Sequence, residues 1–375
     1  MSGIDQRASG PGLRAAQGMS VTNPPRYSVV IATYNRDAEL RRTLDSLATI
    51  RSEAGWELIV VDNNSSDGTA TVIREAATTF PVAIRAVRET VQGRSAALNA
   101  GIRAAAGAII VTTDDDVRVE SDWLDRAGAA LDKQQCGYVG GRVLPLWGAP
   151  RPAWLSDRGG PHWAVIALLD YGDAALEFTT RMPLGVNMAF RREVFDIAGL
   201  WDVRVGRKAG TLLGQEVREW CVRARAHGVR GFYVPELVVQ HLIPADRLSK
   251  RYFRRWFYWR GISRALLFQQ QGLDMESPQD TRHDFTRVPM IAGIPRYLYR
   301  VALAQGIAAL RAILRRRPVE AFEHELWLWM FAGIARQRWR DRHKPFDWTS
   351  SPSSRAAATS LTTDERSKDI QRVGA

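Results

Sequence analysis

The sequence has few cysteines and no long apolar run, and both absences exclude classes of protein. Only two of its 375 residues are cysteines, Cys136 and Cys221, and their spacing fits neither a disulfide framework nor a zinc site. A reducing compartment is therefore expected. No segment reaches the ~20 consecutive apolar residues of a membrane-spanning helix. The best candidate, residues 301–314, is interrupted by Gln305 and Arg311.

Two common nucleotide-binding signatures are also missing. The chain has no Gly-x-x-x-x-Gly-Lys-Ser/Thr loop, and no Gly-x-Gly-x-x-Gly follows the first predicted strand. Neither a phosphate-loop nucleotidase nor a dinucleotide-dependent dehydrogenase is supported. Acidic residues number 40 against 52 basic ones, and the formal charge of +12 favours an anionic partner: phosphate, acidic lipid or nucleic acid.

The order of predicted elements indicates an α/β domain followed by a helical region. Residues 1–25 lack the apolar run of a signal peptide and are expected to form a disordered leader. Residues 26–245 alternate β-branched runs with amphipathic segments, which is typical of a mainly parallel sheet. Residues 246–348 change to arginine-rich and aromatic helical patterns, and residues 349–375 are expected to be a disordered tail.

Four strands and four helices are predicted within the α/β domain. The strands cover residues 27–33, 56–62, 82–87 and 108–113; the helices cover residues 39–50, a stretch from Thr69, residues 96–105 and residues 216–226. The Pro-, Gly- and Trp-rich residues between 144 and 162 predict a long loop over an active site.

Carboxylates close two of the predicted strands. Asp62 ends the second strand, and Asp114, Asp115 and Asp116 follow the fourth. Ligands of open α/β sheets bind beyond the carboxyl ends of the strands. A single carboxylate there often caps a helix, but three adjacent ones repel by roughly 1 kcal/mol per pair and usually persist where a cation neutralises them. Asp114 and Asp116 can point the same way, which suits Mg²⁺ or Mn²⁺ bridging phosphate oxygens.

An ordered set of motifs resembles the family-2 glycosyltransferases of the GT-A fold. The motifs are SVVIATYNR at residues 28–36, ELIVVDNNSSDGT at 57–69, TDDDV at 113–117, LGVNMAFR at 184–191, GLWD at 199–202 and GQE at 214–216. The resemblance covers residues 27–265. It implies transfer of a sugar from a nucleoside-diphosphate sugar, a UDP-sugar being favoured, to an acceptor hydroxyl. Inversion and a divalent metal, Mn²⁺ or Mg²⁺, are also implied.

The same resemblance implies roles for individual residues. Asp62 is expected to contact the nucleotide base, and the pocket around the nucleotide is expected to be lined by Thr33, Tyr34, Asn35, Arg36 and Asp114. Asp114 and Asp116 match the Asp-x-Asp motif of the family, with Asp116 the closest metal ligand. His241 follows a short apolar strand and is expected to complete the metal or diphosphate site, with a packed core imidazole as the alternative.

Two departures from the family pattern shift two of these roles. Where family members commonly carry Glu-Asp, this chain has Gln215 and Glu216, so Glu216 is expected to be the general base and Glu219 is the alternative. The Ala-Arg-Asn of the family is Ala-Leu-Asn at residues 97–99, so a phosphate-side cation is expected from Arg94.

The acceptor side is expected to include Gly185, where a side chain would obstruct close backbone approach. Trp154 is a further candidate there, because indole faces can stack on sugar rings. Trp147 and Trp163 lie in the same region, and simple packing is favoured for at least two of the three tryptophans.

The basic and aromatic residues 247–264 have three possible roles: contact with an anionic membrane, docking on the catalytic domain, or nucleic-acid binding. The first two are weighted equally and nucleic acid is disfavoured. We therefore expect a cytoplasmic enzyme of cell-surface glycan or glycolipid assembly, peripheral on the inner face of the membrane, with a glycan or lipid-linked acceptor. A catalytically weak nucleotide-sugar-binding or scaffold protein is the alternative.

Overall fold

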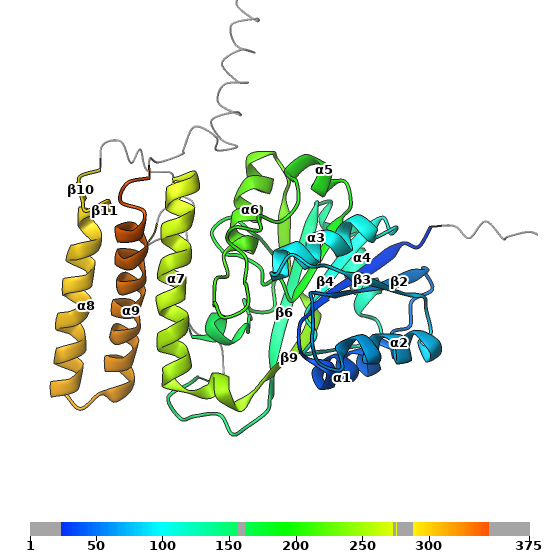
Figure 1. Cartoon of the computed structure of the whole chain (residues 1–375), viewed down its shortest axis with the longest axis horizontal. Coiled ribbons are helices and arrows are strands. Elements are labelled where there is room, and N and C mark those ends of the chain that lie inside the picture. Colours follow the sequence, from blue (N-terminus) through cyan, green and yellow to red (C-terminus); the bar gives the residue numbers. More distant parts are fainter. Residues whose placement is uncertain (1–23, 157–161, 273–274, 276–287, 345–375) are drawn as a thin grey trace, which may run out of the picture.

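The computed structural model describes residues 24–156, 162–272, 275 and 288–344. These residues form an α/β sheet domain and, beside it, a layer of three long helices (Figure 1). The predicted leader up to residue 23 and the predicted tail lie outside the described residues.

A nine-stranded sheet forms the centre of the α/β domain in the described residues, in the order β3-β2-β1-β4-β8-β6-β9-β5, with β7 paired to β9. Strands β1 to β4 pair in parallel, and β8 enters antiparallel between β4 and β6. The strands are β1 (Tyr27–Thr33), β2 (Trp56–Asp62), β3 (Ile84–Arg88), β4 (Ile109–Thr113), β5 (Val117–Val119), β6 (Tyr138–Trp147), β7 (Leu176–Glu177), β8 (Asn187–Arg191) and β9 (Gly231–Ile243). The α/β fold with parallel strands at its centre is confirmed.

Helices connect these strands and cover the two faces of the sheet. They are α1 (Asp37–Leu47), α2 (Thr69–Thr79), α3 (Arg94–Ala104), α4 (Trp123–Gln134), α5 (Val194–Ala198) and α6 (Glu216–Ala226). The strand order reverses after β3, so that α1 and α2 lie on one face and α3 on the other (Figure 1). Helix α1 buries Leu40, Leu44 and Leu47, the three leucines that mark its apolar face in the sequence.

Strand register gathers the polar loops at one edge of the sheet. Thr33 of β1 pairs with Asp62 of β2, and β4 ends beside β1, so the loops after these strands emerge together. Strand β5 begins directly after the aspartates, and its Val117 pairs with His241 of β9. This pairing brings His241 beside the aspartates although 125 residues separate it from Asp116.

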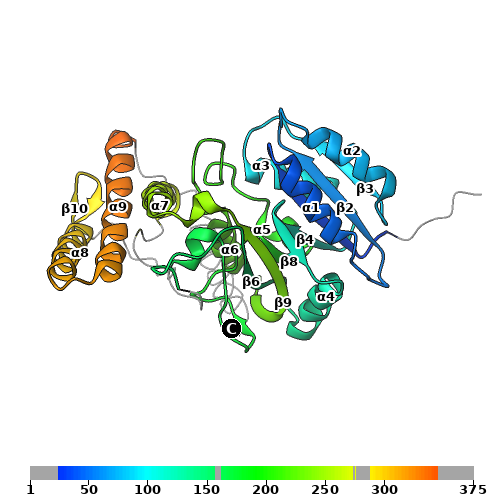
Figure 2. The same ribbon diagram turned by 90° about the horizontal axis from the view of Figure 1, so that it is seen from below.

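The helical layer consists of α7 (Lys250–Gln271), α8 (Arg296–Leu314) and α9 (Pro318–Arg340), with a short hairpin of β10 (Met290–Ile291) and β11 (Ile294–Pro295). Two 3₁₀ turns, η1 (Trp163–Ile166) and η2 (Ala245–Leu248), lie near its base. The Ser249 hydroxyl accepts a hydrogen bond from the Tyr252 N–H and caps α7. Both views place α7 between the sheet domain and α9, with α8 outermost (Figures 1 and 2).

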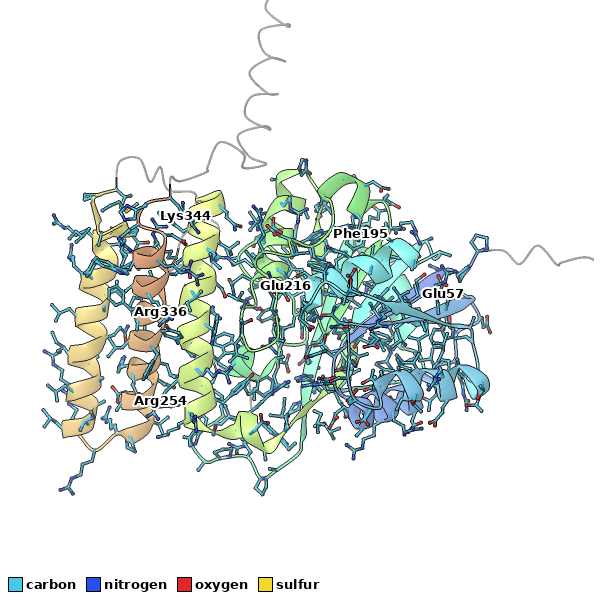
Figure 3. The ribbon with its side chains drawn as sticks, viewed as in Figure 1. Glu57, Phe195, Glu216, Arg254, Arg336 and Lys344 are labelled. Carbon is cyan, nitrogen blue, oxygen red and sulfur yellow. The ribbon has the colours of Figure 1, made fainter. Side chains whose placement is uncertain are left out.

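Helix α7 packs on the sheet domain through its aromatic residues. Phe253 is fully buried, and its ring meets Trp154 edge-on at 4.9 Å between centroids. Phe322 of α9 joins the same contact at 5.4 Å from Trp154, so one core runs from the sheet into the helical layer. Arg254 of α7 reaches Glu325 of α9 at 2.6 Å (Figure 3). The structure thus supports docking as the role of α7.

Helix α8 corrects the expectation about membrane-spanning segments. It is 19 residues long, and its length and composition alone would allow it to cross a membrane, with only 17% of its apolar stretch buried among the described residues. The helix begins five residues before the predicted apolar run and includes Gln305 and Arg311. Its apolar side chains lie mostly at the surface.

The close contact of α7 with α9 predicts an effect of Gly333 on stability. A Cβ at Gly333 would collide with the backbone carbonyl of Tyr258. Gly333→Ala should therefore lower the free energy of unfolding by about 1–3 kcal/mol, as overpacking does. The control Gly306→Ala places its methyl group in open space on α8 and should be neutral or stabilising. Chemical denaturation measures both; equal stabilities of the two variants would contradict the close contact.

Candidate active site

Two adjoining cavities lie at the edge where the parallel strands end. The first, here called the β4 cavity, has a volume of about 360 Å³ and is lined by residues that include Thr33, Arg36, Asp114, Asp115, Asp116 and His241. The second, the α7 cavity, has a volume of about 440 Å³ and is lined by residues that include Gly185, Glu216, Arg218, Trp256 and Arg260. Arg94, Asp114, Ala167 and Arg207 line both, so a ligand in one would lie beside a ligand in the other.

Asp115 is a structural carboxylate of the β4 cavity. It is 5% exposed, accepts a hydrogen bond of 2.7 Å from the Thr33 hydroxyl, and contacts the Arg36 guanidinium at 3.0 Å. Burial raises the pKa of Asp115 to about 6 in spite of the charge of Arg36. Its contacts join the ends of β1 and β4.

Asp116 is buried as well, and two arginines and a histidine lie close to its carboxylate. Its carboxylate lies 2.6 Å from Arg36, 3.2 Å from His241 Nε2 and 3.7 Å from Arg247. Burial alone would raise the pKa of Asp116, but the charge and hydrogen bond of His241 and the charges of Arg36 and Arg247 outweigh it and lower the pKa. Asp116 is therefore a carboxylate anion at neutral pH.

These contacts revise one step of the sequence argument. A cation was expected beside three adjacent aspartates, and the cations that the structure shows are guanidinium groups. Arg36 contacts Asp115 and Asp116, while Arg94 contacts Asp114 at 2.6 Å. The repulsion within the cluster is thus compensated by arginines, and the cluster alone does not require a metal ion.

A metal ion nevertheless fits the side chains present. Ligand atoms of Asp114, Asp116 and His241 lie within 4.8 Å of one another. Asp116 Oδ1 is buried and lies 3.2 Å from His241 Nε2, while the buried Nδ1 atom of His241 has no hydrogen-bond partner among the described residues. Arg36 occupies the other oxygen of Asp116. Two carboxylates and one imidazole are ligands that can hold a divalent cation.

Arg94 links the two cavities. It is the first residue of α3, and its guanidinium contacts Asp114 at 2.6 Å, Glu216 at 3.4 Å and the Gly185 carbonyl at 3.1 Å. Burial alone would lower the pKa of Arg94, but Asp114 and Glu216 raise it, so the side chain stays charged. The cation predicted for the phosphate side lies in the β4 cavity, next to the helix N-terminus.

Glu216 and Glu219, the two candidates for the base, have different surroundings. Glu216 lines the α7 cavity and is 6% exposed; its Oε2 atom has no hydrogen-bond partner among the described residues. It is the first residue of α6 and is labelled in Figure 3. Glu219 is held by Arg223 through two contacts of 2.8 Å and lines neither cavity. Of these two glutamates, Glu216 lines a cavity and Glu219 does not.

Gly185 and Trp154, the acceptor-side candidates, are separated by the structure. Gly185 lines the α7 cavity, and a Cβ there would lie 3.1 Å from both Arg94 and Val217, which is tight. Trp154 lines neither cavity and packs instead against Phe253 and Phe322. Its position fits the packing role that the sequence favoured for most of these tryptophans.

The residues predicted for the nucleotide also divide into two groups. Thr33, Tyr34 and Arg36 line the β4 cavity. Asn35 lies in a left-handed turn with φ of 50°, and its amide oxygen accepts a hydrogen bond from the Ser66 N–H. Asp62 accepts a hydrogen bond from the Ser65 N–H, and neither Asn35 nor Asp62 lines the cavity.

Several residues of the β4 cavity were not predicted from the sequence. Asn63 is buried and holds the 89–93 loop, accepting from the Gly93 N–H and donating to the Glu89 and Val91 carbonyls. Arg207, Lys208 and Arg247 bring further positive charge. The sequence does contain a signal for Asn63, because it is a polar residue directly after Asp62 at the end of a predicted strand. Arg247 and the 206–215 loop carry no sequence pattern that points to the cavity, because the chain fold alone brings them there.

Comparison with known proteins identifies the class. Residues 28–197 match the model of the family described as glycosyl transferase family 2. Glycosyltransferase AglE of Haloferax volcanii is 31% identical over 120 residues, 32% of this chain and 40% of that protein, so the chain matches less than half of that relative's length. The glucosyl-dolichyl phosphate glucuronosyltransferase of the same organism is 23% identical over 64% of this chain and 77% of that protein.

One solved structure shares the fold over most of both chains. The mannosyltransferase PcManGT from Pyrobaculum calidifontis, in complex with GDP-Man and Mn²⁺, matches with a TM-score of 0.56 and 20% identity, covering 85% of this chain and 88% of that chain. The chain thus has the GT-A fold. The match to glycosyltransferase family 2 covers residues 28–197, which is less than half of the chain.

Proposed function

We propose that this protein transfers a sugar from a nucleoside-diphosphate sugar in the β4 cavity to an acceptor hydroxyl in the α7 cavity, with inversion. The observation that carries the proposal is that Arg94 contacts both Asp114 and Glu216. These contacts join the cationic β4 cavity, which has the size of a nucleotide, to the α7 cavity, where the Glu216 Oε2 atom has no hydrogen-bond partner among the described residues. Residues 26–245 would be the catalytic domain, and residues 246–348 a layer that docks on it and contributes one wall of the α7 cavity.

The side chains have distinct parts in this reaction. Glu216 takes the proton of the acceptor hydroxyl while a bond forms between that oxygen and the anomeric carbon of the donor sugar. The bond from this carbon to the diphosphate breaks, and the nucleoside diphosphate leaves with the electron pair. Arg94, Arg36 and Arg247 line the β4 cavity and offset the charge that develops on the leaving group. Inversion follows because base and leaving group lie on opposite faces of the sugar.

A divalent metal, Mn²⁺ or Mg²⁺, is part of the proposal, with Asp114, Asp116 and His241 as the residues that would hold it. Such an ion, when bound, neutralises diphosphate oxygens. Arg36 and Arg247 already place positive charge beside Asp116, and a metal ion would add to it.

Relatives support a glycan or lipid-linked acceptor. One acts by name on glucosyl-dolichyl phosphate, and a second, the succinoglycan biosynthesis protein ExoM of Rhizobium meliloti, is 25% identical over 60% of this chain and 71% of that protein. For the donor we propose a UDP-sugar on the family resemblance, and the GDP-Man complex of PcManGT makes GDP the nucleotide to compare with it.

Asp116→Asn should remove the metal dependence of nucleotide binding. The substitution keeps the size of the side chain but takes away the carboxylate that faces His241. Calorimetric titration of UDP and GDP with Mn²⁺ or with a chelator should show tighter binding with Mn²⁺ for the wild type only. The control Asp45→Asn changes an exposed carboxylate of α1 and should behave as the wild type. A metal effect that persists in Asp116→Asn would remove the metal assignment.

Glu216→Gln should lower turnover by about 10²–10⁴-fold while leaving donor affinity unchanged, because the size is kept and the proton acceptor is lost. Glu219→Gln is the matched control in the same helix; it weakens the pair with Arg223 and should affect stability more than turnover. The measurement is donor-dependent glycoside formation. The opposite ranking would move the base to Glu219, and donor binding without turnover in the wild type would favour a sugar-nucleotide-binding scaffold.

We further propose a cytoplasmic protein that is peripheral on the inner face of the cell membrane, with α8 rather than α7 as the contact. Leu303, Ile307, Leu310 and Leu314 recur at spacings of four, three and four residues and are all exposed, so they form one apolar stripe. Exposed arginines flank the stripe: Arg296 and Arg300 before it, and Arg315, Arg316 and Arg317 after it. An apolar stripe between cationic ends suits an anionic membrane interface.

Leu303→Gln with Leu310→Gln should therefore weaken binding to anionic liposomes. The two leucines are 66% and 58% exposed, so the change should leave the fold intact. Ile197→Gln with Val203→Gln, at 50% and 41% exposure on the sheet domain, is the matched control. Co-sedimentation of the wild type should fall as salt shortens the Debye length from ~10 Å at 0.1 M to ~3 Å at 1 M. Equal sedimentation of the two double variants would exclude α8 as the contact.

A further inference from the structure

Arg36 of the β4 cavity uses only part of its guanidinium for contacts within the protein. Its Nη1 atom donates to Asp115 Oδ1 at 3.0 Å and to Asp116 Oδ2 at 2.6 Å. Its Nε and Nη2 atoms have no hydrogen-bond partner among the described residues, and the side chain is 33% exposed. Arg36 therefore compensates two buried aspartates and keeps two donor atoms for a ligand of the cavity that it lines.

The contact between Arg36 and Asp116 lies where a metal ion would bind. Asp116 is one of the three residues whose ligand atoms could hold a divalent cation. Arg36 contacts its Oδ2 atom, and His241 Nε2 lies 3.2 Å from its Oδ1 atom. A divalent ion on either oxygen of this carboxylate would lie close to the guanidinium, so the two cations would repel each other. Arg36 and a metal ion therefore compete for Asp116.

The β4 cavity is already positive without a metal ion. Among the described residues its only acidic side chains are the three aspartates 114–116, and five basic side chains line it: Arg36, Arg94, Arg207, Lys208 and Arg247. A divalent cation would raise this excess further, and it would be repelled unless an anion enters with it. A nucleoside diphosphate supplies this anion. Arg36 has the shortest contact with Asp116 among the arginines, so its movement frees the carboxylate most directly.

The backbone around Arg36 and Asp115 is held independently of the guanidinium. The Thr33 hydroxyl donates to Asp115 Oδ2 at 2.7 Å, and the Thr43 hydroxyl donates to the Asp115 carbonyl at 2.8 Å. The Arg36 carbonyl accepts from the Leu40 N–H at 2.9 Å and so belongs to the first turn of α1. A change of partner by Arg36 thus requires only a movement of its side chain.

We propose that Arg36 is a displaceable counter-ion of Asp116. Without nucleotide, it neutralises this carboxylate and weakens the binding of a divalent ion. When a nucleoside diphosphate is bound, the guanidinium contacts the diphosphate oxygens instead, and Asp116 becomes available to the metal ion. Arg36 therefore makes metal binding depend on the nucleotide. The inference rests on the proposed glycosyl transfer and its metal site, and it adds how that site is controlled.

The first test is a titration of the full chain with Mn²⁺ in the absence of nucleotide, with unbound Mn²⁺ measured by electron paramagnetic resonance. Arg36→Gln should bind Mn²⁺ about 10-fold more tightly than the wild type, because Asp116 loses a charge-assisted hydrogen bond that competes with the metal. Unchanged or weaker Mn²⁺ binding by Arg36→Gln, or no binding by either protein, would overturn the proposal.

Two control variants separate the contact of Arg36 from the total charge. Arg41→Gln removes an exposed arginine of α1 that pairs with Glu75 and does not line the β4 cavity, so it should bind Mn²⁺ as the wild type does. Arg247→Gln removes a charge that lies 3.7 Å from Asp116, against 2.6 Å for Arg36, and the gain should be smaller. Equal gains in Arg36→Gln and Arg247→Gln would contradict a specific role of Arg36.

The second test is calorimetric titration of UDP in saturating Mn²⁺. Arg36→Gln should bind UDP about 10-fold more weakly, because the diphosphate loses the guanidinium as a partner. The variant is thus expected to gain affinity for the metal alone and to lose affinity for the nucleotide. A purely structural arginine would change both affinities in the same direction, and that result would overturn the proposal. Neither titration involves an acceptor or turnover, so failure of glycosyl transfer would be seen separately.

A charge-balanced pair of variants covers the case in which Arg36→Gln does not fold. Asp115→Asn removes the second buried anion that Arg36 compensates, and the asparagine can still accept from the Thr33 hydroxyl. Arg36→Gln with Asp115→Asn then leaves no added buried charge at residue 115. The double variant should bind Mn²⁺ about 10-fold more tightly than Asp115→Asn alone. Equal Mn²⁺ affinities of these two variants would overturn the proposal.

Discussion

The compensation of buried aspartates by arginines is the constraint on which the site depends. Asp115 and Asp116 are almost fully buried, and a buried carboxylate without a partner would cost several kcal/mol. Their partners come from distant parts of the chain: Arg36 from the turn after β1, and Arg247 from the 3₁₀ turn after β9. The charge balance can be satisfied only when these loops meet at the end of β4, so the fold and the site stabilise each other.

Arg94 extends the same principle from one cavity to the next. A single guanidinium contacts Asp114 on the proposed donor side, Glu216 on the proposed acceptor side and the Gly185 carbonyl. A shift of α3 would therefore change both halves of the site at once. The tight space around Gly185 limits such shifts, because even a methyl group there would press on Arg94. In physical terms, the distance between the proposed base and the leaving group is set by one side chain and its packing.

The sequence predicts the first half of the fold closely because local patterns determine it. Strands β1 and β2 begin and end at the predicted residues, and Glu216 begins α6 as predicted. The position of Arg247 and of the 206–215 loop could not be predicted, since no local pattern shows which strand end a distant loop will meet. Periodicity could not separate the roles of α7 and α8 either, because both helices are rich in arginine and apolar residues. Tertiary packing decides that α7 buries its aromatic rings while α8 leaves leucines exposed.

The helical layer carries arginines on two of its surfaces, an inner one on α7 and an outer one on α8. On the inner side, Arg260 and Arg264 of α7 line the cavity that also contains Glu216, the proposed base. On the outer side, arginines flank an exposed apolar stripe on α8, and α9 separates the two helices (Figure 2). The close contact of α7 with α9 at Gly261 and Gly333 fixes the rotation of α7 and so determines which of its side chains face the cavity. It also fixes how far α9, and α8 beyond it, lie from α7.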